Sequence, residues 1–134
     1  MTSSEPTYAD VVAGVTATIA AYNHAVDDGR TEDVVATYCA DGSCDIQALG
    51  AHEGHDALRA AYAKVEPKVP QRHLVTNVHV TEWSAEHARA LCDFVFMVRG
   101  TDGWRVMLVG RYDDTLHRDG DRWRFHRRVG TFIT

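Results

Sequence analysis

The chain has 134 residues, of which 45% are apolar and 25% are charged, and its formal net charge is −5. These figures predict one globular domain that buries a core without the support of disulfides or a structural metal. The negative charge excludes a broad nucleic-acid-binding surface, and the frequent interruption of the apolar stretches excludes a membrane span. The three cysteines lie in apolar patterns, which predicts buried free thiols and a reducing, cytoplasmic location.

The N-terminal part of the chain has a helical pattern. Residues 1–7 are polar and are expected to form a flexible tail, without a secretion signal, ahead of a single domain over residues 8–134. Apolar side chains then recur every three or four residues from Tyr8 to Val26. Asp27-Asp28-Gly29 is expected to end this helix, because glycine readily takes the left-handed conformation of a helix C-terminus.

Two shorter helices and a short strand are predicted next. Thr31 is expected to be the N-cap of a second helix. Asp41-Gly42 favours a turn, and a short strand is expected over Ser43–Leu49. A third helix is predicted from about His55 to Val65, with Tyr62 on its apolar side.

The second half of the chain has the pattern of an antiparallel sheet. Strands are predicted over Arg72–Thr81, His87–Arg99, Trp104–His117 and Arg122–Phe132. Thr101-Asp102-Gly103 and Asp119-Gly120-Asp121 favour tight turns between them. Helices followed by long consecutive strands predict an α+β fold, in which three N-terminal helices pack on a curved, mainly antiparallel sheet. Such a cone-shaped barrel can enclose a cavity suited to a small apolar ligand, and a filled core is the alternative that gives the same pattern.

A histidine interrupts the first of these strands. The segment Arg72–Val80 alternates with a period of two, which places one set of residues on each face. One face is expected to carry Leu74, Thr76, Val78 and Val80, and the other His73, Val75, Asn77 and His79. A histidine on a largely apolar strand is a hydrogen-bonded group, a solvent-facing group or a group that takes part in a reaction. The pattern alone leaves these three open.

Three segments resemble the SnoaL-like branch of the nuclear transport factor 2-like superfamily, in particular the group that contains scytalone dehydratase and hexachlorocyclohexane dehydrochlorinase. They are Tyr22-Asn-His-Ala-Val-Asp27, Gln71-Arg-His73-Leu-Val-Thr-Asn77, and the hairpin from Gly110-Arg-Tyr112 to Asp119-Gly-Asp-Arg-Trp-Arg-Phe125. The resemblance covers about residues 8–132. It implies an α+β cone, a homodimer joined through the outer sheet face, and enzymes that need no cofactor. Trp104 and Trp123 are candidate apolar contacts for such a dimer.

The resemblance also implies a site. Asp27 corresponds to an aspartate that ends the first helix, and His73 to a histidine on the first long strand. In such a dyad the carboxylate fixes the ring tautomer, and the other ring nitrogen removes a proton from the substrate. The expected substrate-binding residues are Tyr22, Tyr62, Asn77, Asp93 and Arg111. The implied function is a cofactor-free lyase or isomerase for a small hydrophobic, cyclic or polyketide-like molecule.

Several alternatives stay open at this point. Asp27 is also explained as an acid in a helix-end turn, and Asp28 or Asp93 is an alternative partner for His73. Arg111 is also explained as a solvent-facing residue. A basic cluster is explained by an exposed sheet edge, and its members are Arg118, Arg122, Arg124, Arg127 and Arg128.

Two other chemistries and one other class of function compete with this one. His52-Glu53-Gly54-His55 lacks the spacing of a zinc-binding helix motif, so zinc is not expected. Arg111-Tyr112-Asp113 raises the Asp-Arg-Asp chemistry of epoxide hydrolysis, but no acidic residue follows Asp121, which argues against it. The competing function is non-enzymatic: a small-ligand-binding module, or the structural small subunit of a ring-hydroxylating dioxygenase.

Overall fold

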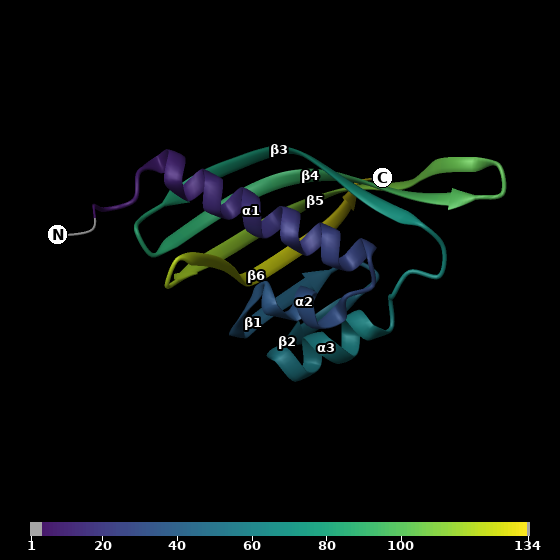
Figure 1. Cartoon of the computed structure of the whole chain (residues 1–134), viewed down its shortest axis with the longest axis horizontal. Helices are drawn as coiled ribbons and strands as arrows, with labels where there is room; N and C mark the ends of the chain where they lie inside the picture. Colours follow the sequence, from purple (N-terminus) through teal and green to yellow (C-terminus); the bar gives the residue numbers. More distant parts are fainter. Residues whose placement is uncertain (1–3, 134) are drawn as a thin grey trace.

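The computed structural model describes residues 4–133, and it places three helices on one face of a curved, open sheet of six strands (Figure 1). The helices are α1 (Tyr8–Asp27), α2 (Thr31–Ala36) and α3 (His55–Ala63). The strands are β1 (Tyr38–Ile46), β2 (Gly50–Glu53), β3 (Gln71–Trp83), β4 (His87–Gly100), β5 (Gly103–Asp119) and β6 (Arg122–Ile133). This is the predicted α+β arrangement. Residues 1–3, part of the tail predicted over residues 1–7, lie outside the described residues.

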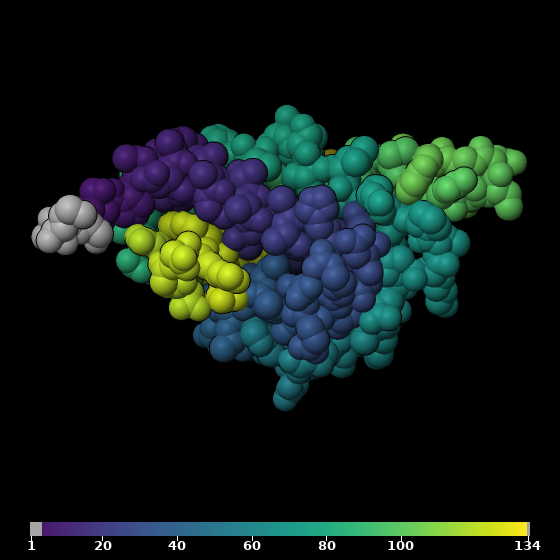
Figure 2. Space-filling view, in the orientation of Figure 1, coloured from purple at the N-terminus to yellow at the C-terminus, as the bar shows by residue number. Residues whose placement is uncertain are grey.

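The sheet has the order β2-β1-β6-β5-β4-β3. Strands β3 to β6 form the predicted antiparallel meander, and β1 joins its far edge by pairing in parallel with β6. The tight turns expected before β5 and β6 are present, with Gly103 and Gly120 at φ values of 106° and 66° that other residues rarely adopt. The β4–β5 hairpin extends beyond the body of the molecule (Figure 2).

The local predictions around β1 need correction. Thr31 is the first residue of α2 rather than its N-cap, and its hydroxyl donates to Glu66 instead. Asp41-Gly42 does not interrupt the chain as a turn, because β1 runs through it with an irregularity in its pairing to β6. The segment 50–53, for which no strand is predicted, pairs with β1 as β2. Pairing with distant residues therefore overrides the local turn signal.

Helix α1 ends at Asp27, and this ending brings Asp27 to the sheet. The helix begins after Thr7, which forms a capping box with Asp10, and Gly29 takes the left-handed conformation at its other end. The buried face of α1 packs on the sheet, and it contains Val11, Val15, Ile19 and Tyr22. Trp123 packs against the helix where Gly14 leaves room, because a Cβ atom there would lie 2.3 Å from the Trp123 ring.

The prediction for the two tryptophans and the basic cluster is also corrected in part. Trp123 is a core residue with 6% exposure, whereas Trp104 is 47% exposed near the start of β5. Arg128 is fully buried beside Asp114 and does not belong to an exposed sheet edge. Alternation explains the difference, because Arg128 shares the inner face with its neighbours on β1 and β5 while Arg127 points outward.

A β-bulge inverts the face pattern of β3. Asn77 has a φ of 56°, and the pairing with β4 shifts between Thr76 and His79. The extra residue reverses the alternation, so His73 faces the same side as Val80, while Asn77 and His79 are exposed. The prediction that His73 shares a face with Asn77 and His79 is therefore wrong beyond the bulge.

The prediction of buried free thiols is confirmed for Cys44 and Cys92, whereas Cys39 is free but only half-buried. Within residues 4–133, no helix has the length and apolarity needed to cross a membrane.

Candidate active site

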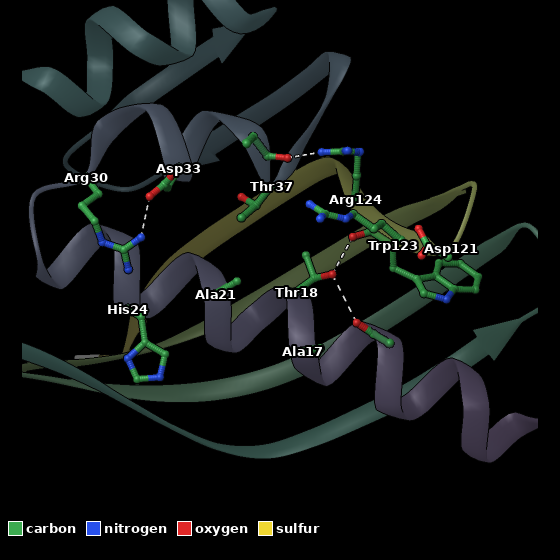
Figure 3. A pocket seen from close by; sticks show the side chains of 13 residues that line it. Ala17, Thr18, Ala21, His24, Arg30, Asp33, Thr37, Asp121, Trp123 and Arg124 are labelled. Atoms are coloured by element: carbon green, nitrogen blue, oxygen red, sulfur yellow. Dashed lines mark hydrogen bonds and ion pairs between the residues drawn. The ribbon is translucent and has the colours of Figure 1, made fainter.

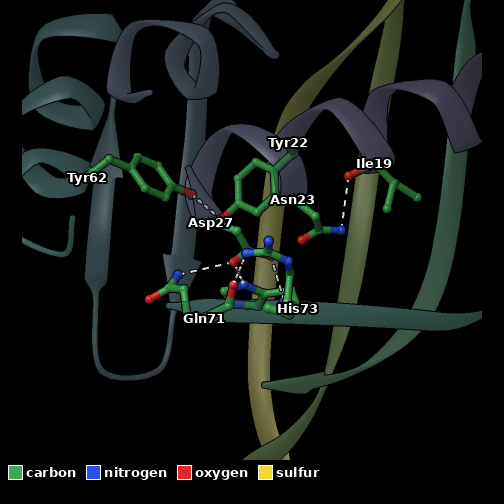
Figure 4. A network of polar contacts seen from close by, with 8 residues as sticks. Ile19, Tyr22, Asn23, Asp27, Tyr62, Gln71 and His73 are labelled. Carbon is green, nitrogen blue, oxygen red and sulfur yellow. Dashed lines mark hydrogen bonds and ion pairs between the residues drawn. The ribbon is translucent and has the colours of Figure 1, made fainter. Parts of the chain in front are cut away.

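Asp27 and His73 meet where the end of α1 lies over the start of β3 (Figure 4). The Asp27 Oδ1 atom is 2.6 Å from the His73 Nδ1 atom. The second carboxylate oxygen, Oδ2, accepts the backbone N–H of His73 at 2.8 Å. Gln71 adds a third hydrogen bond, because its Nε2 donates to Oδ1 at 3.1 Å. The carboxylate is therefore clamped by β3 from two sides.

This environment keeps Asp27 ionised. Its side chain is 5% exposed, and burial acts to raise the pKa of Asp27. The hydrogen bonds from the ring and backbone of His73 and from Gln71 outweigh burial, and they hold the pKa of Asp27 below its usual value. An ionised carboxylate only accepts hydrogen bonds, so Nδ1 of His73 carries a proton and donates it to Asp27.

The tautomer leaves the other ring nitrogen of a neutral His73 as a base. With Nδ1–H bound to Asp27, Nε2 has a free lone pair. The ring lies against Phe96 and Phe94, with centroid distances of 4.7 Å and 5.9 Å. The side chain is 12% exposed and lines a cavity, so the base is shielded but accessible.

The cavity between the helices and the sheet has a volume of about 220 Å³. Most of its wall is aromatic or aliphatic, and its rings are those of Tyr22, Tyr62, Phe94, Phe96, Tyr112 and Phe132. The Tyr62 hydroxyl is 2.7 Å from the Tyr22 hydroxyl and 2.7 Å from the Tyr38 hydroxyl. Burial raises the pKa of each of these three phenols well above its usual value, so all three are neutral donors.

Tyr22 and Tyr62 line the cavity as predicted, but the structure separates the three remaining predicted site residues from the dyad. Arg111 forms an ion pair with Asp93, at 2.7 Å between Nε and Oδ1, and Asn77 donates to the same carboxylate. All three lie on the outer sheet face, because Asp93 and Arg111 alternate with the inward-facing Phe94 and Tyr112. They do not line the cavity.

The alternative partners for His73 are also placed. Asp28 is the C-cap of α1 and lies 3.6 Å from Arg30, on the solvent side. Asp93 is held by Arg111 on the opposite sheet face. Asp27 is therefore the acid that reaches the His73 ring.

Sequence reasoning missed Gln71, Phe94, Phe96 and Tyr112. Gln71 is two residues before His73, so alternation alone places it on the same face and could have identified it. The two phenylalanines and the tyrosine belong to β4 and β5, and their contribution depends on strand register. The register brings Phe96 opposite His73.

Two other features are weaker candidates for a site. A larger surface hollow of about 610 Å³ lies between α1, α2 and the β5–β6 turn (Figure 3). Two of its charged side chains are engaged, because Arg30 pairs with Asp33 and Arg124 donates to the backbone carbonyl of Ala36. The rings of His52 and His55 bond the backbone carbonyls of Leu49 and Tyr38. Residues 4–133 contain no cluster of three potential metal ligands.

The fold and the inward-facing acid–histidine pair define a SnoaL-like α+β protein. The SnoaL-like domain model matches residues 8–129, and the chain belongs to this family. An uncharacterized protein of Mycobacterium tuberculosis is 31% identical over 114 residues, which cover 82% of this chain and 77% of that protein.

Three solved structures share the fold. A candidate scytalone dehydratase from Novosphingobium aromaticivorans has a TM-score of 0.81 at 18% identity, covering 92% of this chain and 85% of its own. The beta subunit of a candidate aromatic-ring-hydroxylating dioxygenase from the same species has a TM-score of 0.80 at 19% identity, covering 92% and 90%. A hexachlorocyclohexane dehydrochlorinase has a TM-score of 0.79 at 16% identity, and the match covers 96% of this chain and 90% of the dehydrochlorinase. At these identities the likeness concerns the fold.

Proposed function

We propose that the protein is a cofactor-free lyase or isomerase in which His73 removes a carbon-bound proton from a small hydrophobic substrate. The observation that carries this proposal is the 2.6 Å contact between Asp27 and the His73 ring inside an aromatic cavity. It leaves the lone pair of Nε2 facing a cavity whose wall is mostly aromatic or aliphatic. When Nε2 accepts the proton, the imidazolium is stabilised by the ionised carboxylate of Asp27.

The tyrosines supply the second half of the chemistry. Removal of a proton next to a carbonyl places negative charge on the carbonyl oxygen, which needs hydrogen-bond donors. Tyr22 and Tyr112 line the cavity, and the contact with Tyr62 orients the Tyr22 hydroxyl. The resulting enolate then either expels a leaving group from the neighbouring carbon, as in a lyase, or is reprotonated at another carbon, as in an isomerase. Arg111, on the outer face, has no part in this scheme.

The cavity limits the size of the substrate. A volume of about 220 Å³ is smaller than the range of about 300–1,000 Å³ that holds drug-sized ligands. We therefore expect a molecule with a single ring and a carbonyl group. A polyketide with several fused rings would extend out of the cavity.

The test detects proton abstraction without knowledge of the product. Single-ring ketones and enones are incubated with the protein in deuterated buffer, and exchange of carbon-bound protons is followed by NMR. We expect His73→Ala to reduce exchange by about 10²–10⁴-fold. His79→Ala is the matched control, because His79 lies on the same strand but faces outward beyond the bulge. Equal exchange in His73→Ala and the parent protein would exclude His73 as the base.

The outer sheet face supports a second proposal, that the protein forms a homodimer. Leu74, Val95, Val109 and Ile133 lie opposite one another across β3, β4, β5 and β6 and form one apolar row. Leu74 and Ile133 are 52% and 55% exposed, which is unusual for a continuous row on a monomer. Sedimentation is expected to give a dimer mass at micromolar concentration, and Val109→Asp is expected to give a monomer.

The same row also fits the alternative function, a structural subunit that binds a different chain. A monomer mass for the purified parent protein would favour that alternative over the homodimer. Absence of proton exchange from every ketone and enone, together with capture of a single-ring ligand in the cavity, would favour a non-catalytic binding module.

A further inference from the structure

A buried arginine lies behind the tyrosine rings of the cavity. Arg128 on β6 and Asp114 on β5 are both fully buried, with 3.1 Å between Nε and Oδ1. The atoms of this ion pair are not aligned for hydrogen bonding, and no partner among residues 4–133 satisfies the guanidinium. Burying such a pair carries a desolvation cost, so stability alone explains it poorly.

The guanidinium is stacked on aromatic rings. Its central carbon is 3.5 Å from the centroid of the Tyr112 ring and 4.2 Å from that of the Tyr22 ring. Phe125 covers a third side at 4.4 Å. Tyr22 and Tyr112 line the cavity, whereas Arg128 does not. The two phenol rings therefore separate the cation from the cavity, and its charge acts on the site through them.

The positive charge is only partly neutralised. A guanidinium does not lose its proton in a protein, so Arg128 stays charged. Burial raises the pKa of Asp114 to about 7, although Arg128 acts to lower it. Near neutral pH the carboxylate is therefore partly protonated, and positive charge remains behind the rings. Burial also raises the pKa of Tyr112 to about 12, and among the opposing influences Arg128 is the strongest.

We propose that Arg128 is a positioning residue that acts through the rings of Tyr22 and Tyr112 and makes their hydroxyl groups stronger hydrogen-bond donors to the substrate oxygen. This role rests on the proposed function, in which those hydroxyls bind the oxygen that becomes negatively charged. A cation over the ring face draws electron density from the phenol, which makes its O–H group more acidic. A more acidic donor stabilises an oxyanion more strongly than a neutral carbonyl, so the effect favours the transition state.

The test titrates one phenol directly. A fluorinated tyrosine, whose hydroxyl ionises in a range where the fold is stable, replaces Tyr112 and is followed by ¹⁹F NMR. The titration is repeated in Asp114→Asn and in the double variant Arg128→Met/Asp114→Asn. The double variant removes the cation without leaving a buried carboxylate unpaired. The same label at Tyr8, which is 43% exposed and contacts Trp83 rather than Arg128, is the control.

The two backgrounds have opposite expected effects on the labelled Tyr112. Asp114→Asn is expected to increase its acid dissociation constant several-fold, because the Asp114 carboxylate raises the pKa of Tyr112. The double variant is expected to lower the constant about tenfold relative to Asp114→Asn, the effect of losing a desolvated cation–π contact. The label at Tyr8 is expected to keep its value. Shifts of opposite sign show that each charge of the ion pair acts on the Tyr112 hydroxyl.

The proposal is overturned if Asp114→Asn lowers the dissociation constant or leaves it unchanged, or if the double variant matches Asp114→Asn within twofold. Should the double variant fail to fold, the kcat of Arg128→Lys, which keeps the cation but replaces the planar guanidinium stacked on the rings, decides the question: a kcat equal to that of the parent protein overturns the proposal. The titration needs no substrate, so its result is separate from the test of the proposed function. That function fails if proton exchange persists in His73→Ala. With a substrate known, Arg128→Met/Asp114→Asn is expected to lower kcat while KM stays close to the parent value.

Discussion

Replacing Asp27 by asparagine should reverse the tautomer of His73 while leaving the fold intact. Both carboxylate oxygens are used as acceptors: one by the backbone N–H of His73, the other by its ring and by Gln71. The amide group that Asp27→Asn introduces has only one oxygen. The backbone N–H has no alternative protonation state, so the oxygen must stay with it and the NH₂ group must face the ring.

The ring can adjust to this change. Its Nδ1 becomes an acceptor and the proton moves to Nε2, so the atom that faces the cavity is no longer a base. The same substitution in a Ser-His-Asp triad reduces kcat about 10⁴-fold for this reason. We expect turnover or proton exchange by the Asp27→Asn protein to fall about 10²–10⁴-fold.

A modest loss of stability should accompany the change, since charge-assisted hydrogen bonds become neutral ones. We expect the free energy of unfolding to fall by about 1–3 kcal/mol near neutral pH. The sign of its pH dependence follows from the lowered pKa of Asp27 in the folded state. The extra stability of the parent protein over Asp27→Asn is fully present above the unfolded-state pKa of about 3.9, and it is lost as the pH falls through the lower pKa of Asp27 in the folded state.

The assay is ¹⁵N NMR of the histidine rings, which distinguishes the two neutral tautomers without a substrate. The His73 signals are assigned by their loss in His73→Ala, and the exposed His79 ring is the internal control. A His73 ring that keeps its proton on Nδ1 in the Asp27→Asn protein, or full activity of that protein, would refute the reasoning.

Three further substitutions test the surroundings of the site. Tyr62→Phe removes the central hydroxyl of two 2.7 Å contacts, and urea denaturation should show that the free energy of unfolding falls by about 2–3 kcal/mol. Tyr38→Phe removes only one of these contacts and should lower it by about 1 kcal/mol. Equal losses in the two variants would contradict the chain of hydroxyls. Gly110→Ala places a Cβ atom 2.3 Å from a phenylalanine of the cavity wall and 2.9 Å from a backbone oxygen. We therefore expect about 1–3 kcal/mol of destabilisation and weaker ligand binding. Gly100→Ala, whose Cβ atom would have its nearest neighbour at 3.9 Å, should leave both measurements close to the parent values. The pKa of Asp114 in the folded state is raised to about 7, so the folded parent holds an extra proton above pH 4 and loses stability as the pH rises towards 7. Between pH 4.5 and 7.5, denaturation should show that the free energy of unfolding of Asp114→Asn rises by roughly 2–4 kcal/mol relative to that of the parent. Parallel pH profiles of the two proteins would contradict the raised pKa.

The sequence by itself determined the three helices, the four long strands and their order, but not β2 or the full extent of β1. The apolar spacing along α1, the glycine after Asp27 and the turn residues before β5 and β6 are local signals, since each depends on a few neighbouring residues. The resemblance of three segments to the SnoaL-like family named Asp27 and His73, and the family and fold are confirmed. Their catalytic role stays a prediction.

Only the tertiary structure decided which side chains share the cavity. The period-two pattern of β3 holds until Asn77, where one extra residue inverts the positions that follow up to Val80, and nothing local in the sequence marks this bulge. Register likewise placed Arg111 and Asp93 on the outer face and brought Phe96 opposite His73. The physical reason is that strand pairing is a contact between distant residues, whose energy depends on both strands together.

The same reason explains Arg128, which the sequence presents as one of several arginines near the C-terminus. Its burial depends on Asp114 and on the rings of Tyr22 and Tyr112, which come from β5 and α1. A charge is buried only where distant groups offset its desolvation. Sequence spacing contains no record of such an environment, and the packed structure creates it.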